Sequence, residues 1–168
     1  MDPPFRKAEK SSASEPTLPR PIRRLLHVYW RFSRGLTLGI RAAVIDPDDR
    51  VLLVRHTYVR GWHLPGGGVE ARETALDALA RELREEGCIE LVGAPRLHGV
   101  FFNGHVSDRD HVLLYVVRDF RVTAAKRRDR EIAEAGFFPL HALPEGVTAA
   151  TRARLEEVVD GRPPALLW

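Results

Sequence analysis

Hydrophobic and polar positions alternate most regularly between Glu73 and Ile89. Apolar side chains recur there at spacings of three and four, the pattern of an α-helix with one buried face. They are Leu76, Leu79, Ala80 and Leu83. The pattern predicts a helix that begins at Glu73-Thr74 and packs this stripe against a core.

Shorter apolar runs predict strands. They cover residues 36–45, 51–56, 90–92, 97–103 and 112–117. The first two flank a turn at residues 47–50, which predicts a β-hairpin. Both are largely apolar, so we expect strands that are covered on both faces. A second helix is predicted at residues 148–159, ending at Asp160-Gly161, with Leu155, Val158 and Val159 facing inward.

The length of 168 residues suits one α/β domain and a tail. Residues 1–20 are rich in Pro, Ser, Lys and Glu, which predicts a disordered tail. Residues 21–35 predict an amphipathic helix with an arginine-rich face, and residues 36–168 form the predicted domain. The helix could pack on the domain, form a homodimer contact through Tyr29, Trp30 and Phe32, or lie weakly on an anionic membrane surface.

Composition excludes several classes of protein. A single cysteine, Cys88, rules out an internal disulfide and a Cys-rich zinc site. No run of 18 apolar residues predicts a membrane span, and the charged N-terminus does not resemble a secretory signal, so we expect a cytoplasmic protein. The net charge of +3 comes from residues 1–45, since the remainder is slightly acidic.

Three carboxylates share one face of the predicted helix around Glu73–Ile89. At about 100° of rotation per residue, Glu82, Glu85 and Glu86 fall within one arc. Carboxylates together with substrate phosphates are the usual ligands of Mg²⁺, and the Gly66-Gly67-Gly68 run lets bare backbone approach a phosphate before a helix. The alternative is a solvated helix face whose charges have no ligand.

The spacing of these residues resembles the Nudix box, G-x5-E-x7-R-E-U-x-E-E-x-G-U, in which U is a bulky aliphatic residue. The matching positions are Gly67, Glu73, Arg81, Glu82, Leu83, Glu85, Glu86 and Ile89. Cys88 stands where the family has its second glycine, and Gly87 precedes it. Because glycine commonly caps a helix C-terminus in the left-handed conformation, we interpret this as a cap that has moved by one residue.

The resemblance implies the Nudix fold, a mixed β-sheet sandwiched between helices, with a strand and turn at residues 131–144. It also implies hydrolysis of a nucleoside diphosphate linked to another moiety. Glu82, Glu85, Glu86 and the Gly66 carbonyl would hold Mg²⁺ or Mn²⁺, and Glu82 is the first candidate for the general base. Glu73 and Arg81 resemble an internal ion pair of the family that orients Glu82.

Other site predictions are less specific. Gly67 and Gly68 are predicted substrate contacts, and Glu134 or Glu131 would supply a further acidic residue. Trp62 is a lid or a packing residue. A polar loop carries His105 and His111, and residues 126–130 form a basic connector; each could contact phosphate or be merely solvated.

Substrate identity stays open between ADP-ribose or another NDP-sugar, a nucleoside triphosphate and a dinucleoside polyphosphate. No P-loop and no G-x-S-x-G motif is present, and no stable complex with nucleic acid is expected. The alternative function is a catalytically weak, nucleotide-binding Nudix-like module that docks to a membrane or a partner through the basic helix 21–35.

Overall fold

The computed structural model of the protein describes residues 35–168. The predicted tail and nearly all of the predicted helix 21–35 lie outside these residues, so they stay predictions. Within residues 35–168, no helix has the length and apolarity needed to cross a membrane.

Seven strands and two helices make up the described region. They are β1 (Thr37–Val44), β2 (Arg50–His56), α2 (Ala75–Gly87), β3 (Ile89–Leu91), β4 (Arg96–Phe102), β5 (Asp110–Val117), β6 (Phe120–Val122), β7 (Ile132–Pro139) and α3 (Ala149–Val159). Every predicted strand and both predicted helices in this range are confirmed. The sequence did not predict β6, whose three residues are too few for a periodic signal.

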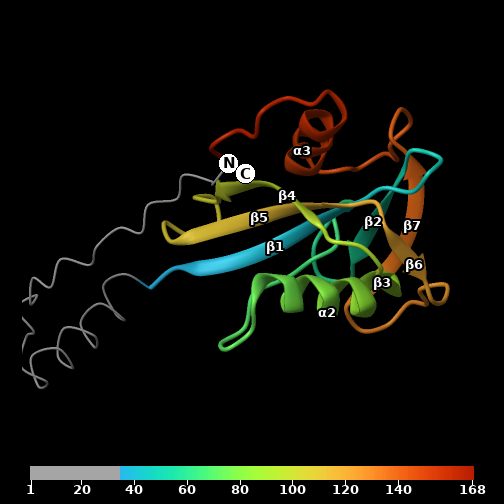
Figure 1. Ribbon diagram of the computed structural model, residues 1–168, viewed down its shortest axis with the longest axis horizontal. Helices are drawn as coiled ribbons and strands as arrows, with labels where there is room; N and C mark the ends of the chain where they lie inside the picture. The colour runs from blue at the N-terminus through green and yellow to red at the C-terminus, as the bar shows by residue number, and fades with distance from the viewer. Residues whose placement is uncertain (1–34) are drawn as a thin grey trace, which may run out of the picture. The chain divides into compact units, whose positions relative to one another are not determined.

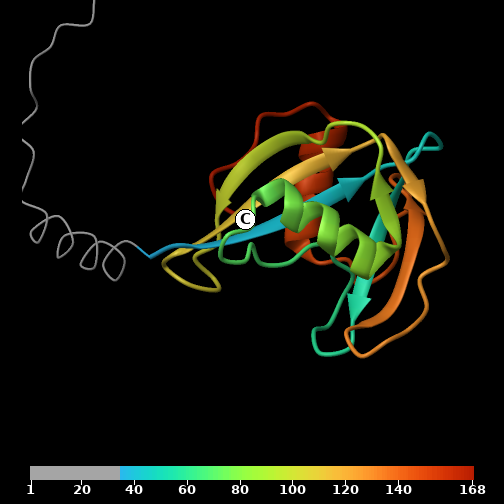
Figure 2. The ribbon, with the colours of Figure 1, turned by 60° about the horizontal axis from the view of Figure 1, so that its bottom comes forward.

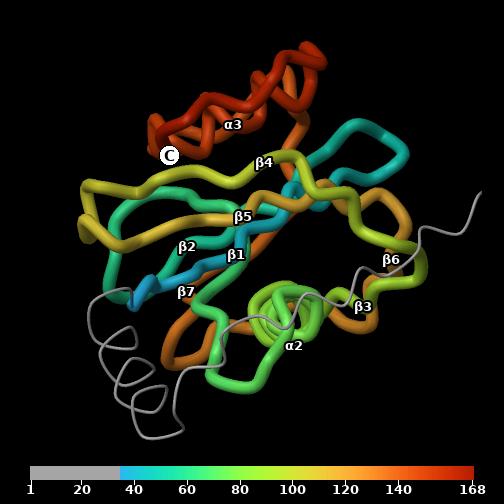
Figure 3. The backbone as a smooth tube through the Cα atoms, turned by 60° about the vertical axis from the view of Figure 1, so that its left-hand side comes forward, coloured from blue at the N-terminus to red at the C-terminus, as the bar shows by residue number. Residues whose placement is uncertain are grey.

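The strands lie between the two helices. β5 pairs in parallel with β1 and antiparallel with β4, while β2 pairs with β7 and β3 with β6, both antiparallel. In Figure 1, α3 covers one side of the strands and α2 the other, and the end-on view of Figure 3 shows the same three layers. This mixed α/β architecture is the one that the Nudix resemblance implied.

The predicted hairpin of β1 and β2 is wrong. The two strands are joined only near the turn, by a bridge between Ile45 and Val51 and by bonds between Asp46 and Arg50, one of which runs from the Asp46 amide to the Arg50 carbonyl at 2.9 Å. Beyond this turn, the strands separate and pair with β5 and β7. Two strands that are apolar on both faces carry no local signal of their pairing partner, so the sequence pattern could not distinguish a hairpin from this arrangement.

Two hydrophobic clusters fill the space between the layers. One packs Ala78, Leu79 and Leu83 of α2 against the strands, and the other packs Leu155 of α3 on the opposite side. Trp62 is buried in the second cluster, with its ring edge-on to that of Phe138 at 4.8 Å between centroids. Trp62 is therefore a packing residue.

The buried face of α2 differs from the predicted stripe at Leu76, whose side chain is 48% exposed. Ala75 and Ala78 face the core in its place. Alanines carry little weight in a hydrophobic pattern, yet they let the helix approach the strands closely. Figure 2 shows α2 lying across the strands. On α3, Val159 is likewise exposed, contrary to the prediction.

The C-terminus of α2 also corrects the sequence interpretation. Cys88 itself adopts the left-handed conformation, with φ 53° and ψ 39°, and its amide donates to the Arg84 carbonyl. Gly87 remains in the helix, where a Cβ would lie 2.6 Å from Cδ2 of Leu52. The cap has therefore not moved: Gly87 is needed for packing, and Cys88 takes the strained position.

Candidate active site

The glycine-rich segment lies along the edge of β1 like an additional strand. The Ala42 amide donates to the Pro65 carbonyl at 2.9 Å, and the Ile40 amide donates to the Gly67 carbonyl at 2.8 Å. The Val69 amide then bonds to the Leu38 carbonyl. These backbone bonds hold the turn in place ahead of α2.

Two of the three glycines lie in close contacts, and backbone atoms make the contact at Gly66 the one that requires glycine. Gly66 has φ 141°, and a Cβ there would lie 2.1 Å from the Ile40 carbonyl oxygen. A Cβ on Gly67 would lie 2.3 Å from Oε1 of Glu82. Gly68 has no atom within 4 Å of such a Cβ. The turn therefore brings bare backbone of Gly66 and Gly67 against the glutamates of α2.

The polar groups of Gly66 bond to two side chains. Its amide donates to Oε2 of Glu86 at 2.8 Å, and its carbonyl accepts from Nη1 of Arg41 at 2.6 Å. The same Arg41 nitrogen donates to the Leu64 carbonyl at 3.0 Å. Sequence reasoning missed Arg41, although a charged residue within the apolar strand β1 was a usable signal.

Glu86 is a buried carboxylate whose neighbours offset its charge only in part. Burial raises the pKa of Glu86 to about 7, while the Gly66 amide and the Arg41 charge act in the opposite direction. Its Oε1 lies 3.7 Å from Nδ1 of His56. Burial and the positive charge of Arg41 lower the pKa of His56 to about 4, so this imidazole is neutral near pH 7 and forms no ion pair with Glu86.

Arg81 links the start of α2 to its glutamates. Its Nε and Nη2 donate to the two carboxylate oxygens of Glu73, at 2.9 and 3.1 Å, and Nη2 also donates to the Gly68 carbonyl. Its Nη1 donates to Oε1 of Glu82 at 2.6 Å and lies 3.5 Å from Glu85. The hydrogen bonds that Arg81 donates to Glu73 and Glu82 raise the pKa of Arg81. The structure thus contains the predicted Glu73–Arg81 pair, and it extends to Glu82.

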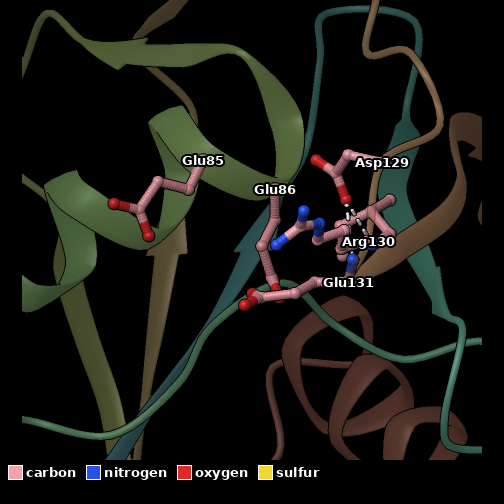
Figure 4. Close-up of a pocket in the computed structure, with 6 residues that line it drawn as sticks. Glu85, Glu86, Asp129, Arg130 and Glu131 are labelled. Carbon is pink, nitrogen blue, oxygen red and sulfur yellow. Dashed lines mark hydrogen bonds between the residues drawn. The ribbon is translucent and has the colours of Figure 1, made fainter.

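The three predicted metal-binding glutamates are not equally placed. Glu82 contacts Gly67 and Glu86 contacts Gly66, whereas Glu85 is mostly exposed and points away from Glu86 in Figure 4. Across residues 35–168, no three His, Cys, Asp or Glu side chains lie close enough together to form a metal-binding group. The donor types, carboxylates and a glycine carbonyl, suit a hard divalent cation, although the Gly66 carbonyl accepts a hydrogen bond from Arg41 in this structure.

A cavity of about 490 Å³ opens beside Glu86. It is lined by Glu85, Glu86, Asp129, Arg130, Glu131 and Ile132. Figure 4 shows the Glu131 side chain reaching toward Glu86, and the charge of Glu131 contributes to the raised pKa of Glu86. Of the two predicted further acidic residues, Glu131 therefore lies at this cavity. Glu134 instead pairs with Arg55 at 2.5 Å and does not line the cavity.

The basic connector is partly engaged in structural contacts. Nζ of Lys126 donates to the Glu85 carbonyl at 2.5 Å and to the Asp129 carboxylate. The Lys126 bond and the amides of Ile132 and Glu131 lower the pKa of Asp129 to about 2. Lys126 thus joins the cavity wall to α2. Neither His105 nor His111 lines this cavity.

This fold, with its glycine turn on β1 and acidic helix α2, defines a protein of the Nudix class. The sequence model described as the NUDIX domain matches residues 35–159, and the chain belongs to this family. The resemblance based on the box is therefore confirmed.

Individual relatives match at lower coverage. The chain is 48% identical over 54 residues to an RNA pyrophosphohydrolase of Halorhodospira halophila, which is 32% of this chain and 30% of that one. It is 32% identical over 106 residues to an ADP-ribose pyrophosphatase of Methanocaldococcus jannaschii, or 61% and 62% of the two chains. The match thus spans less than two thirds of each of these relatives.

Among solved structures, the fold is similar to that of a MutT NUDIX hydrolase from Burkholderia pseudomallei. The TM-score is 0.62 at 29% identity, and the match covers 74% of this chain and 98% of the other. The likeness therefore extends over nearly all of that hydrolase.

Proposed function

We propose that the protein is a hydrolase that cleaves the phosphoanhydride bond of a nucleoside diphosphate linked to another moiety, or of a nucleoside triphosphate. The observation that carries this proposal is the contact between Glu86 and Gly66 at the cavity. A buried carboxylate and a glycine backbone meet there, beside a second carboxylate, Glu82, that Arg81 orients.

NUDIX proteins generally use divalent metal ions. We infer that Glu82, Glu85, Glu86 and the Gly66 carbonyl hold Mg²⁺ or Mn²⁺ here. Such an ion would neutralise charge on the diphosphate and lower the pKa of the attacking water. Because Glu85 points away from Glu86, its side chain would have to change rotamer to join the set.

The residues of the chain supply the remaining chemistry. Arg81 bonds to Oε1 of Glu82, which leaves Oε2 to hold the ion or, instead, to accept the proton of the water as general base. Glu73 fixes the other side of the Arg81 guanidinium through two hydrogen bonds, so it orients Glu82 indirectly. Gly66 and Gly67 add no side chain of their own to the turn, so its backbone can approach phosphate oxygens closely.

The names of the relatives agree on the type of bond. One relative is named an RNA pyrophosphohydrolase and the other an ADP-ribose pyrophosphatase, and both names describe cleavage of a pyrophosphate bond. We therefore propose a pyrophosphohydrolase activity. The group beyond the diphosphate remains to be assigned among NDP-sugars such as ADP-ribose, nucleoside triphosphates and dinucleoside polyphosphates.

A turnover screen tests the proposal. The full chain is incubated with one substrate of each class, with Mg²⁺, with Mn²⁺ or with chelator, and products are identified by mass. We expect metal-dependent cleavage of one class, and Glu86→Gln should lower turnover by about two orders of magnitude or more. Glu90→Gln is the matched control, because Glu90 pairs with Arg121 on the surface.

Two outcomes would count against the hydrolase. Nucleotide binding without turnover in the wild type would favour the binding module as the function. Equal turnover in wild type and Glu86→Gln, with matched thermal melts, would remove Glu86 from the site.

A further inference from the structure

A second cavity, of about 470 Å³, opens at the end of β2 and is lined by residues 55–61. Its volume falls within the range of sites for small organic ligands, about 300–1,000 Å³. None of the Nudix box residues lines it. We call it the β2-end cavity.

This cavity borders the acidic cavity beside Glu86. The Thr57 amide donates to the Glu131 carbonyl at 2.8 Å, and the Thr57 hydroxyl donates to the Arg130 carbonyl at 2.7 Å. Thr57 lines the β2-end cavity, whereas Arg130 and Glu131 line the acidic one. A ligand with its diphosphate at Glu86 would therefore have the β2-end cavity beside it.

Three rings lie next to one another at the end of β2, and two of them, His56 and Tyr58, line the β2-end cavity. The His63 and His56 rings are 5.8 Å apart, and the His56 and Tyr58 rings are 5.2 Å apart, measured between centroids. His56 is buried, but Tyr58 is 70% exposed. The Tyr58 ring is thus supported on one side by His56 and otherwise open to a ligand.

Tyr58 also lies within electrostatic range of the acidic site. Partial burial, and then the carboxylates of Glu86, Glu131 and Glu82, raise the pKa of the Tyr58 hydroxyl, while Arg41 opposes them. These are the acidic residues that meet at the glycine turn and the acidic cavity. Their influence agrees with the position of Tyr58 in the cavity that borders the acidic one.

We propose that the β2-end cavity binds the nucleobase of the substrate, which stacks on Tyr58 while the diphosphate lies at Glu86. The proposal rests on the function proposed above. The exposed Tyr58 ring, tilted by 37° against the buried His56 ring, offers its open face to a base. Stacking of a base on such a ring contributes about 1–3 kcal/mol, or roughly 5- to 150-fold in affinity. Arg60 at the cavity wall adds a positive charge on the same loop.

The alternative is a tyrosine that is simply solvated on a loop. The two hypotheses predict different affinities for a ligand that lacks the base. A stacking surface distinguishes a nucleotide from the same sugar phosphate without its base, whereas a solvated tyrosine does not.

The test compares nucleoside monophosphates with ribose 5-phosphate. Binding of AMP, GMP, CMP, UMP and ribose 5-phosphate to the full chain is measured by calorimetry in the presence of Mg²⁺. We expect at least one nucleotide to bind about tenfold more tightly than ribose 5-phosphate. Tyr58→Leu should remove this difference, Tyr58→Phe should keep it, and ribose 5-phosphate should bind all variants alike.

Val92→Ala is the control, because Val92 is an exposed apolar residue on another element and should leave every affinity unchanged. The proposal is overturned if no nucleotide binds better than ribose 5-phosphate, or if Tyr58→Leu weakens both ligands equally. A wild type that hydrolyses no phosphoanhydride instead removes the proposed function. The turnover screen therefore separates the two failures.

Discussion

Glu86 on α2 and Glu157 on α3 are glutamates that the fold buries equally, each 6% exposed. Glu157 has protein partners for its charge. Nη2 of Arg154 bonds to it at 2.5 Å, Nε2 of His98 lies at 3.3 Å, and the Ala165 amide donates at 3.3 Å. This network ties α3 to β4 and to the segment before the C-terminus.

The charge of the Glu86 carboxylate is offset far less by its neighbours. Its one hydrogen bond comes from the Gly66 amide, and within residues 35–168 no Arg or Lys nitrogen lies within 4.0 Å of its carboxylate. The comparison shows two uses of a buried carboxylate. Glu157 stabilises the packing of α3. The burial of Glu86 costs free energy that its neighbours offset only in part, and a structural role does not explain this cost. Carboxylates of this kind are common at functional sites.

Breaking the Glu157 network should have the largest effect on stability. Glu157→Gln leaves the buried Arg154 guanidinium without its carboxylate, so we expect a loss of about 3 kcal/mol in the free energy of unfolding. Urea unfolding measures this loss. The neighbouring Glu156→Gln is the control, since Glu156 forms only an exposed pair with Arg162 at 3.5 Å and should change stability by less than about 1 kcal/mol. Equal effects of both variants would contradict the comparison.

The matching substitution Glu86→Gln should alter how stability depends on pH. The folded-state pKa of Glu86, about 7, lies above the ordinary value of 4.5, so the folded protein retains a proton that the unfolded chain releases in between. The stability from this proton is complete below pH 4.5 and is lost as the pH rises to about 7. Glu86→Gln does not lose this stability. Between pH 4.5 and 7, its free energy of unfolding should therefore rise by roughly 2–3 kcal/mol relative to that of the wild type.

Unfolding in chelator at several pH values measures the difference. His56, whose pKa is lowered to about 4 from 6.5, adds stability as the pH rises between these values. That contribution is present in both proteins, so it cancels in the comparison to first order. Parallel stability curves for the two proteins would show that Glu86 carries no such cost.

Removing Arg41 should have a smaller effect on stability than either glutamate substitution. Arg41→Met deletes the bonds to the Leu64 and Gly66 carbonyls and the charge that favours ionised Glu86. We expect a loss of about 1–2 kcal/mol and faster hydrogen exchange of the Gly66 amide. Arg55→Met, on strand β2, is the control because Arg55 contacts Glu134 and the Trp62 ring but neither Gly66 nor Glu86. Unchanged exchange at Gly66 would mean that Arg41 does not hold the turn.

The residues that follow α2 and α3 provide the comparison with the smallest expected effect on stability. After α3, a glycine, Gly161, takes positive φ, whereas after α2 Cys88 does so. Cys88→Gly should therefore stabilise the protein by about 1 kcal/mol. Gly87→Ala should destabilise it, since the new Cβ would clash with Leu52. Thermal melts of both variants measure the effects. A stabilised Gly87→Ala would show that Gly87 is not needed for packing, whereas a destabilised Cys88→Gly would contradict the assignment of the cap to Cys88.

Local features of the chain were the ones that sequence reasoning recovered. The spacing of Gly67, Glu73, Arg81 and the glutamates identified the family, and apolar runs located most strands. Periodicity was less reliable where small side chains pack closely, as at Ala75 and Ala78, because it gives Leu76 more weight than the actual contacts do. The choice between Glu131 and Glu134 also needed the structure, since their neighbours lie far away along the chain.

By itself, the sequence determined the elements, the Nudix box and the class of chemistry, because each depends on residues close together in the chain. Only the tertiary structure decided that β1 and β2 pair with different strands, that Arg41 holds the Gly66 carbonyl, and that Glu86 is buried while Glu85 is exposed. Each of these depends on contacts between distant segments, which determine the burial and the electrostatic environment of a side chain and which a local pattern does not encode.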